Sequence, residues 1–430
     1  MRAAVIGGGI TGLSVGYELA KKGCRVTIFE KESRIGGLAG SLQIGDVWLE
    51  HFYHHIFKSD TAILGWIDEL GLKDRLIWRP SSIGFFHKSA IHHFTTPLEL
   101  LKFSPLSFKD RIKLGLAVLQ FQRMKNWEEL ESVTCRDWFS QRVSREAYET
   151  VWEPLLRLKF GDAHDRIPAS WIWGRIHPRA RSRSKGGMRE ELGYLLGGFD
   201  LMIEKMKEEI VSLGGEVVEG APVEYVIQER NAAKGVVVRG QELFSDIVVS
   251  TIAIPALLKI APPLPEDYRT QIGGIRYQAV TCLIMECERS ISPVYWLNIS
   301  DPEVTFGGLI EHTNFVDPGQ YGGKRIVYIF NYLSTDNPYF KMSAEEYFAA
   351  HKASISRINP EFRSDWVKKI HLHRADYGTP IYTLGYRSKM PPFTSPLSGL
   401  YLVNTSQIYP YDRNMNNCAA LGQQFVRTLK

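Results

Sequence analysis

Hydrophobic residues in the first thirty positions fall into two short continuous runs, separated by a glycine-rich turn and a helical pattern. Residues 3–6 form the first run, which ends at Gly7, as expected of a strand buried in a parallel sheet. Residues 26–29 form the second run. The order strand, tight turn, helix and strand predicts an α/β fold with a parallel sheet.

Later stretches carry the same kinds of pattern. Residues 197–227 predict a helix, a turn at Gly214 and Gly215, and a pair of strands. Residues 244–255 predict another buried strand, and the C-terminal stretch predicts strand, loop and helix. We therefore expect one discontinuous domain, assembled from residues 1–80, 190–255 and 385–430.

The intervening segments have a different character. Residues 97–127 have a helical pattern, with apolar positions on one face and basic residues elsewhere. Residues 279–287 and 325–333 are alternating runs that predict strands of an antiparallel sheet. We expect these segments to form a second, α+β substrate domain, made of residues 81–189 and 256–384.

Length and composition agree with two globular domains. The chain has 430 residues, of which 44% are hydrophobic, and its net charge of +5 is compatible with an anionic substrate or a membrane surface. No base-stacking motif lies on a basic stripe, so nucleic acid is not an expected partner. Five cysteines without a CxxC pair favour a reducing compartment over disulfides or a zinc site. We expect a cytoplasmic protein, since neither a signal-peptide pattern nor a transmembrane-length apolar run is present.

Gly7, Gly9 and Gly12 form the pattern G-x-G-x-x-G between the first predicted strand and the helix. The first glycine permits the turn, the second lets backbone approach a pyrophosphate, and the third lets the helix pack on the strand. The amides at the start of the helix then face the phosphates. Glu30 follows the second strand, where a carboxylate binds ribose hydroxyls. These features predict dinucleotide binding, whereas a glycine turn without a ligand would leave Glu30 unexplained.

The residues after Glu30 distinguish between dinucleotides. The acid is followed by Lys31, by Arg34 and by the pair Gly36 and Gly37. This segment resembles the second signature of FAD enzymes of the glutathione-reductase type, particularly the flavin amine oxidase branch. The resemblance implies a Rossmann-like FAD-binding domain, in which the arginine and the glycine pair wrap the pyrophosphate and the edge of the flavin.

Residues 49–60, which we call the histidine segment, are rich in histidine and aromatic side chains. The segment is similar to the histidine-containing segments of UDP-galactopyranose mutases, carotenoid desaturases and protoporphyrinogen oxidases, in which the chain runs beneath the flavin. We expect His54 and His55 to act there, with Phe52 and Phe57 as walls of the ring. A metal site is disfavoured, because adjacent residues of an extended chain point in opposite directions. Packed loop histidines without a role at the flavin are the alternative.

Two basic stretches bear on the substrate. Residues 152–185 combine tryptophans with a basic run, and arginine with tryptophan suits a diphosphate joined to a sugar or a prenyl chain. A solvated basic loop between core tryptophans is the alternative. Residues 107–126 are expected to form a core-facing helix, and a helix that rests on an anionic membrane is the other interpretation. The tryptophans and basic residues meant within residues 152–185 are Trp152, Trp171, Trp173, Arg175, Arg179, Arg181, Arg183 and Lys185.

The C-terminal stretch resembles the part of the flavin amine oxidases that completes the cofactor site. Asn404 and Thr405 occupy the place where relatives often have glycine and aspartate. The helix after the loop 409–414 is expected to direct its first amides at the flavin. Residues 197–227 resemble the return segment of the same superfamily, which implies that the backbone at Val223 brackets the adenine. The residues expected to bind the cofactor are Gly7, Gly9, Ile10, Thr11, Gly12, Glu30, Lys31, Arg34, Gly36, Gly37, Leu38, Val223, Asn404, Met415 and Asn416.

The resemblance implies an FAD-dependent oxidoreductase of the amine oxidase, protoporphyrinogen oxidase and desaturase group, which takes a hydride from a C–N or C–C bond. The candidate catalytic residues are His54, His55 and Arg175. The expected partner is a small molecule, anionic or lipid-linked, and the enzyme could lie peripherally on a membrane. A redox-neutral mutase that acts on a nucleotide sugar is the main alternative, and a flavoprotein scaffold without catalysis is a third.

Overall fold

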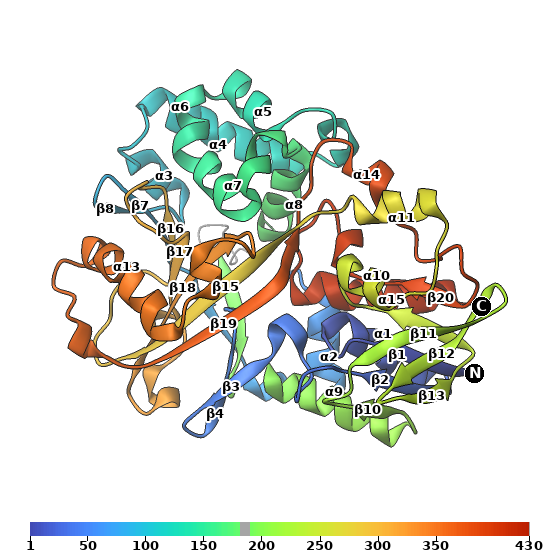
Figure 1. The fold of residues 1–430 in the computed structure, drawn as a ribbon. Coiled ribbons are helices and arrows are strands. Elements are labelled where there is room, and N and C mark those ends of the chain that lie inside the picture. Colours follow the sequence, from blue (N-terminus) through green and yellow to red (C-terminus); the bar gives the residue numbers. More distant parts are fainter. Residues whose placement is uncertain (181–189, 430) are drawn as a thin grey trace.

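The computed structural model describes residues 1–180 and 190–429, and it places a parallel sheet beside a larger mixed sheet (Figure 1). All strands of the first sheet are parallel, and they include the runs predicted at the N-terminus and within residues 244–255. The order across the sheet is β10 (Glu216–Val218), β2 (Arg25–Phe29), β1 (Arg2–Ile6), β14 (Ile247–Ser250) and β20 (Leu400–Leu402).

The two faces of the parallel sheet are covered by different elements. Ala3 and Val5 of β1 share an apolar core with helices, whereas Ala4 and Ile6 share a core with a small antiparallel sheet on the opposite face. Burial on both sides explains why this strand shows no alternation of polar and apolar residues. The helices are α1 (Ile10–Lys21), α2 (Thr61–Glu69), α9 (Asp200–Ser212) and α15 (Met415–Thr428), and the small sheet comprises β11 (Val223–Glu229), β12 (Ala232–Val238) and β13 (Gln241–Phe244).

A seven-stranded sheet forms the second half of the molecule. The strands predicted at residues 279–287 and 325–333 lie side by side within it. The sheet is antiparallel as expected, except that β7 and β16 run parallel. β7 and β8 were not predicted, because such short apolar runs have no distinctive periodicity. The strand order is β19 (Val367–Pro380), β15 (Tyr277–Cys287), β18 (Arg325–Leu333), β17 (Gly308–Glu311), β16 (Trp296–Ile299), β7 (Ile83–His87) and β8 (Ala90–His93).

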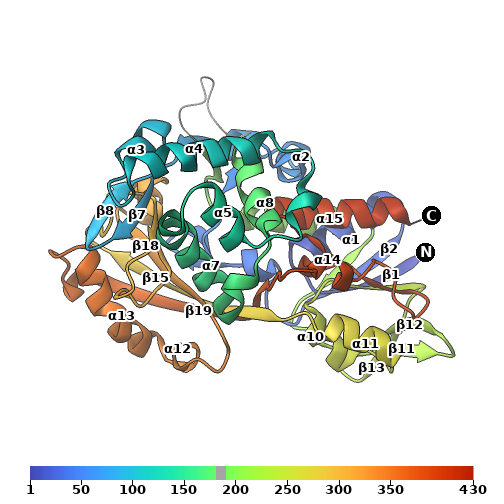
Figure 2. The same cartoon turned by 90° about the horizontal axis from the view of Figure 1, so that it is seen from above.

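Helices of the first intervening segment cover one side of the molecule (Figures 1 and 2). The helix predicted over residues 97–127 is two helices, because Pro105 interrupts the first and the Ser107 side chain caps the second. The second buries Leu114 and Phe121, so the expected core-facing side is present. The helices are α3 (Pro97–Lys102), α4 (Phe108–Arg123), α5 (Cys135–Arg142), α6 (Arg145–Ala147), α7 (Glu153–Phe160) and α8 (Ala169–Ala180).

Smaller elements complete the chain. Within the described residues, no helix is long and apolar enough to span a bilayer. The remaining strands are β3 (Ser41–Ile44) and β4 (Val47–Glu50), which form a hairpin, and β5 (Ile56–Phe57), β9 (Glu191–Leu195) and β6 (Leu76–Pro80), which form a three-stranded sheet. The remaining helices are α10 (Ile254–Ile260), α11 (Glu266–Gly273), α12 (Pro338–Lys341), α13 (Ala344–Ile358) and α14 (Tyr386–Lys389).

Glu50, at the end of β4, connects three parts of the fold from a buried position. Its backbone carbonyl accepts a hydrogen bond of 3.0 Å from the Tyr328 hydroxyl of β18. Its carboxylate accepts hydrogen bonds from the Tyr194 hydroxyl at 2.9 Å and from the Phe199 amide at 2.6 Å. Burial raises the pKa of Glu50 to about 7. These bonds fix the chain that leads into the histidine segment against the mixed sheet.

We expect Tyr328→Phe to lower the free energy of unfolding by about 1–2 kcal/mol, because the buried Glu50 carbonyl loses its partner while the ring remains. Urea denaturation followed by tryptophan fluorescence measures this change. Tyr401→Phe, at a ring that packs on Phe425, is the control and should alter the free energy by less than about 0.5 kcal/mol. Equal stability of Tyr328→Phe and the wild type would contradict the link.

Candidate functional site

Two glycine turns meet at the carboxyl end of β1. The Gly36 amide donates a hydrogen bond of 2.8 Å to the Gly8 carbonyl, which holds the second turn against the first. A Cβ at Gly9 would lie 3.8 Å from the Gly37 Cα, so a larger side chain would fill the space between the turns. At Gly12 a Cβ would overlap the Gly7 carbonyl, which explains the third glycine of the motif. The structure thus brings the two sequence signatures together.

The N-terminus of α1 opens into this space. Gly9 caps the helix without a side-chain hydrogen bond, and the first turn, which contains Ile10, Thr11 and Gly12, carries no acidic residue. Its free amides and its partial positive charge suit an anionic ligand. A second helix N-terminus lies beside it, because the Ser14 hydroxyl donates a hydrogen bond of 2.7 Å to the Ala419 carbonyl, five residues into α15.

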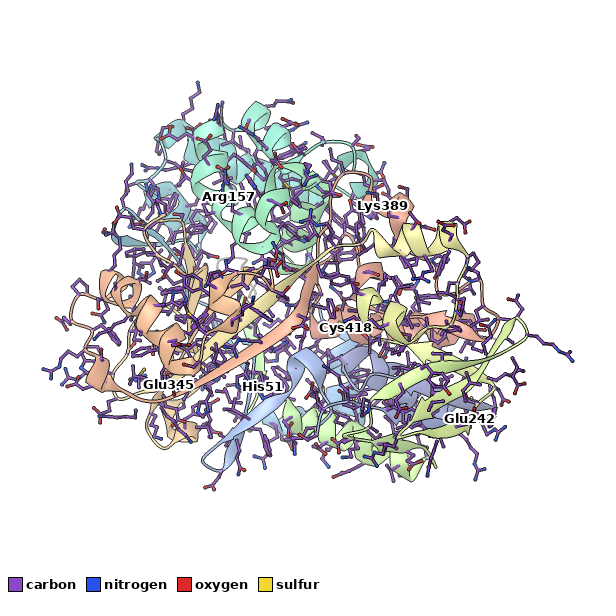
Figure 3. The ribbon with its side chains drawn as sticks, viewed as in Figure 1. His51, Arg157, Glu242, Glu345, Lys389 and Cys418 are labelled. Carbon is purple, nitrogen blue, oxygen red and sulfur yellow. The ribbon has the colours of Figure 1, made fainter. Side chains whose placement is uncertain are left out.

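Register places the start of α1 and the start of α15 at the same end of the molecule. Thr11 is hydrogen-bonded to Cys418, which lies on α15 in the middle of the fold (Figure 3). Met415, at the start of α15, is buried. The Asn416 side chain caps α2 by accepting a hydrogen bond of 2.9 Å from the Ala62 amide. The Asn416 side-chain oxygen is therefore engaged by α2.

Backbone amides hold the carboxylate of Glu30, the residue that follows β2. Its carboxylate accepts hydrogen bonds from the Gly8 amide at 2.7 Å and from the Glu32 amide at 2.9 Å. The return segment passes beside it, since the Ala221 amide donates to the Glu30 carbonyl at 2.7 Å shortly before Val223 begins β11. The chain just before Val223 thus lies against Glu30, near the expected adenosine end.

The remaining expected cofactor residues differ in their surroundings. The Arg34 guanidinium forms ion pairs of 2.9 Å with Asp200 and with Glu204, so its side chain binds α9. Gly37 is exposed, and Leu38 is half-buried in the same turn. Their neighbour in the sequence signature, Lys31, points to solvent. The Asn404 side chain caps a short 3-10 helix by accepting from the Ser406 amide at 3.0 Å.

The three histidines of residues 49–60 occupy three different environments. His51 stacks on His373 of β19 with ring centroids 3.9 Å apart, and it lies beside β4 (Figure 3). His54 Nδ1 lies 2.5 Å from the Phe52 carbonyl, and His55 Nδ1 lies 3.1 Å from the Tyr295 hydroxyl. Among the residues that the structure describes, no group of three His, Cys, Asp or Glu side chains could hold a metal.

Burial keeps these imidazoles uncharged. It lowers the pKa of His54 to about 4, and it lowers the pKa of His55 well below its ordinary value, with a further contribution from the charge of Arg179. Neutral imidazole has one donor nitrogen and one acceptor nitrogen. His54 and His55 can therefore orient a ligand by hydrogen bonding, but they do not supply positive charge.

Positive charge comes instead from a group that we call the cationic cluster: Lys159, Arg175 and Arg413 around the carboxylate of Asp412. Arg175 Nη1 lies 2.7 Å from Asp412 Oδ2, and Lys159 forms an ion pair with the other carboxylate oxygen. Arg413 Nη2 donates a hydrogen bond of 3.2 Å to the Tyr332 hydroxyl. Burial raises the pKa of Asp412, but the charges of Lys159 and Arg175 outweigh this effect and hold the pKa well below its ordinary value.

The cluster depends on a close approach between α8 and the C-terminal loop. A Cβ at Gly174 would press on the Pro410 carbonyl, so glycine is needed for the helix to contact the loop. The next residue, Arg175, then reaches Asp412. Trp171 and Trp173 of the same helix are buried, and Trp152 is half-buried. Arg175 and Arg179 are thus parts of a packed helix, whereas Arg181, Arg183 and Lys185 lie outside the described residues.

Aromatic rings form a wall beside the cluster. The Tyr53 ring lies 4.9 Å from Trp296 and 4.6 Å from Phe330, measured between centroids. Lys159 Nζ lies 5.9 Å from the centroid of the Tyr332 ring. Sequence reasoning singled out His54, His55 and Arg175 but missed Lys159, Arg413, Tyr53, Trp296 and Tyr332. The missed residues come from a helix, strands and loops far apart in sequence, and no motif spacing joins them.

A cavity of about 450 Å³ lies at the N-terminus of α15. Asn414, Asn416 and Asn417 line it from the start of that helix. Trp173 of α8 and Tyr411 of the C-terminal loop form its wall, close to the cationic cluster. The cavity therefore lies between the N-terminus of α15 and helix α8.

The family model for flavin containing amine oxidoreductases matches residues 10–415, nearly the whole chain. The protein belongs to this family. It is therefore an FAD-dependent oxidoreductase, and the fold and the cofactor that the sequence predicted are confirmed. As a flavin containing amine oxidoreductase, it acts on a small molecule.

Two further kinds of comparison show which proteins the chain is similar to. The 15-cis-phytoene desaturase of Synechococcus elongatus is 22% identical, over 98% of this chain and 94% of the relative. An oxidoreductase from Methanosarcina mazei has a solved structure with a TM-score of 0.78 at 19% identity, with 100% of both chains covered. Reduced UDP-galactopyranose mutase shares the fold with a TM-score of 0.77 at 14% identity, over 99% of this chain and 94% of that chain.

We expect Gly9→Val to abolish FAD binding, because a branched side chain would occupy the space between the two glycine turns. The ratio of visible flavin absorbance to protein absorbance measures the loss, and circular dichroism verifies the fold. Gly65→Ala is the matched control, since a Cβ there meets open space, and this variant should purify yellow. A fully loaded Gly9→Val protein would show that this turn does not hold the cofactor.

Proposed function

We propose that this enzyme oxidises a C–N or C–C bond of a substrate that carries an anionic group on an apolar body. The observation that carries the proposal is the cationic cluster, a buried group of three cations and one carboxylate beside the histidine segment. FAD bound by residues 1–80, 190–255 and 385–430 would accept the hydride from that bond. Residues 81–189 and 256–384 would bind the substrate.

An excess of buried positive charge favours an anionic ligand. Asp412 is ionised and balances one of the three cations, so two positive charges remain in a place of low dielectric. Arg413 Nε is buried, and it has no hydrogen-bond partner among the described residues. A carboxylate or phosphate would satisfy both requirements through charge-assisted hydrogen bonds. A cationic amine would be repelled, which favours other substrates over ordinary amines.

The aromatic wall suits the apolar part of the substrate. Tyr53, Trp296 and Phe330 present ring faces and edges to one another, and such surfaces bind hydrocarbon and exclude water. The related cyanobacterial protein is named a phytoene desaturase, and a desaturase acts on C–C bonds. The wall and the cluster together support a substrate with one apolar end and one anionic end.

The other residues have supporting roles in this proposal. The turns at Gly9 and Gly37 and the amides of α1 would bind the pyrophosphate, and Glu30 would bind the ribose of the adenosine. His55 keeps its orientation through the Tyr295 hydroxyl, so its second nitrogen can hydrogen-bond to a ring placed against it. Because His54 and His55 are neutral, we propose that they position the reactants and do not carry a proton between them.

A redox-neutral mutase that acts on a nucleotide sugar is the second candidate. The same cationic cluster would bind a diphosphate, because Arg175 and Lys159 are both held at the Asp412 carboxylate. The mutases that residues 49–60 resemble have a glycine and an arginine on the final strand, and Asn404 and Thr405 stand there in this chain, which weighs against a mutase. The oxidoreductase is therefore preferred.

Anaerobic mixing of the oxidised holoenzyme with candidate substrates distinguishes the two reactions. We expect an anionic, apolar substrate to bleach the visible flavin band without an added reductant. Arg175→Gln should retain FAD but require roughly tenfold or more substrate for the same bleaching rate, because a charge-assisted hydrogen bond is lost. Conversion of a nucleotide sugar solely by dithionite-reduced enzyme would replace this proposal with the mutase.

The cluster predicts a pH dependence of substrate binding. Burial lowers the pKa of Lys159 to about 8, so Lys159 is cationic below this pH and neutral above it. We expect kcat/KM for an anionic substrate to fall as the pH rises through about 8, since the free enzyme loses one of its cations. Lys159→Gln should remove this step from the profile, whereas Lys341→Gln, at an exposed position, should retain it. An unchanged profile in Lys159→Gln would refute the assignment.

A further inference from the structure

The largest group of exposed apolar side chains in the described chain lies on α3 and α4. Most large apolar residues are buried in the cores, but Phe108 is 62% exposed and Leu116 is 60% exposed. Soluble proteins expose such side chains singly, and contiguous patches mark sites of interaction. We call this group the apolar face, and it consists of Leu98, Leu101, Phe108, Ile112, Leu116 and Leu119.

The spacing along α4 makes this face continuous. Phe108, Ile112, Leu116 and Leu119 follow one another at intervals of four, four and three residues, which places them on one side of the helix. The opposite side is buried through Leu114, Ala117 and Phe121, and Phe121 stacks on Trp138 of α5, so the helix is fixed with its other apolar side outward. In Figure 2, α3 and α4 run along one edge of the molecule.

The charges around the apolar face are of one sign. From residue 97 to residue 126, every exposed charged side chain is basic: Lys102, Lys109, Arg123 and Lys125. The two acidic residues of this stretch are not exposed. Glu99 accepts hydrogen bonds from the Thr95 and Thr96 amides, and Asp110 is buried at the start of α4. Exposed acidic residues resume at Glu128.

We propose that the apolar face of α3 and α4 docks on an anionic lipid surface. An apolar stripe with basic flanks inserts into the boundary between headgroups and acyl chains, while the lysines and arginine contact the anionic headgroups. A second copy of this chain fits less well. A twofold interface would bring the same patch on each copy together, and the basic flanks would repel one another.

The apolar face of α4 lies next to the chain that lines the cavity at the start of α15, so docking would bear on how the substrate reaches that cavity. α4 ends at Arg123, and the next residues, Lys125 and Trp127, line the cavity at the start of α15. A docked enzyme would therefore hold this cavity close to the lipid surface. This route for the substrate rests on the apolar substrate of the proposed function, whereas docking itself does not depend on any reaction.

Cosedimentation of the FAD-loaded protein with vesicles tests docking without turnover. We expect binding to vesicles of phosphatidylcholine mixed with phosphatidylglycerol, weaker binding to phosphatidylcholine alone, and a decrease as salt is added. The double variant Ile112→Gln and Leu116→Gln should bind anionic vesicles roughly tenfold or more weakly, because two apolar side chains that would be buried in the lipid on binding have been replaced by polar ones. Lys109→Glu with Arg123→Glu should remove the preference for anionic lipid.

The matched control is the double variant Val211→Gln and Leu213→Gln, at exposed apolar positions by the end of α9. It should bind vesicles like the wild type, and all variants should keep the flavin spectrum of the folded holoenzyme. Failure of the wild type to bind anionic vesicles at low salt, or equal binding by the α4 double variant, would overturn the proposal. A dimer in solution that the α4 variant dissociates would assign the face to self-association instead.

Discussion

The side-by-side packing of α1 and α15 determines where the cofactor end of this enzyme lies. Gly422 permits the approach, because a Cβ there would lie 2.6 Å from the Ser14 side chain. Ser14 then bonds the Ala419 carbonyl, so two helices from opposite ends of the chain start at the same level. Their partial positive charges add at one place, next to the two glycine turns. An anionic dinucleotide complements this arrangement, and the substrate is positioned relative to it.

The second constraint is a charge imbalance that the fold maintains. Gly174 lets α8 touch the loop at Pro410, and this contact brings Arg175 to the Asp412 carboxylate, which Lys159 of α7 also contacts. Burying cations in excess of carboxylates is unfavourable for the free protein. Such an arrangement is understandable where a ligand completes it, since groups held ready for an anion need no rearrangement when the anion binds. The imbalance is therefore the physical basis of the proposed anionic substrate.

The sequence was informative where local chemistry fixes the backbone. Gly7 has a positive φ of 103°, and a Cβ at Gly12 would overlap the Gly7 carbonyl, so the turn and the parallel strands around it could be predicted from a local pattern. Lys159 and Arg413 could not, because they meet through tertiary packing between α7 and the loop before α15. β7 and β8 were missed for a related reason, since a short strand is defined by its partners and not by its own pattern. On α4 the sequence indicated the buried side, but it did not show that the other side is apolar as well.

Burial acts differently on the histidines and on the cationic cluster, and this difference assigns their roles. It lowers the pKa of His54 to about 4, whereas an arginine keeps its charge in the same surroundings. The histidines thus provide hydrogen bonds, and the arginines provide charge over the whole physiological range. Asp412 and Arg413 directly precede Asn414, which caps α15 through the Asn417 amide. The loop that would bind the anionic group of the substrate is therefore continuous with the helix expected to face the cofactor, and an anion that engages Arg413 would also stabilise the start of that helix.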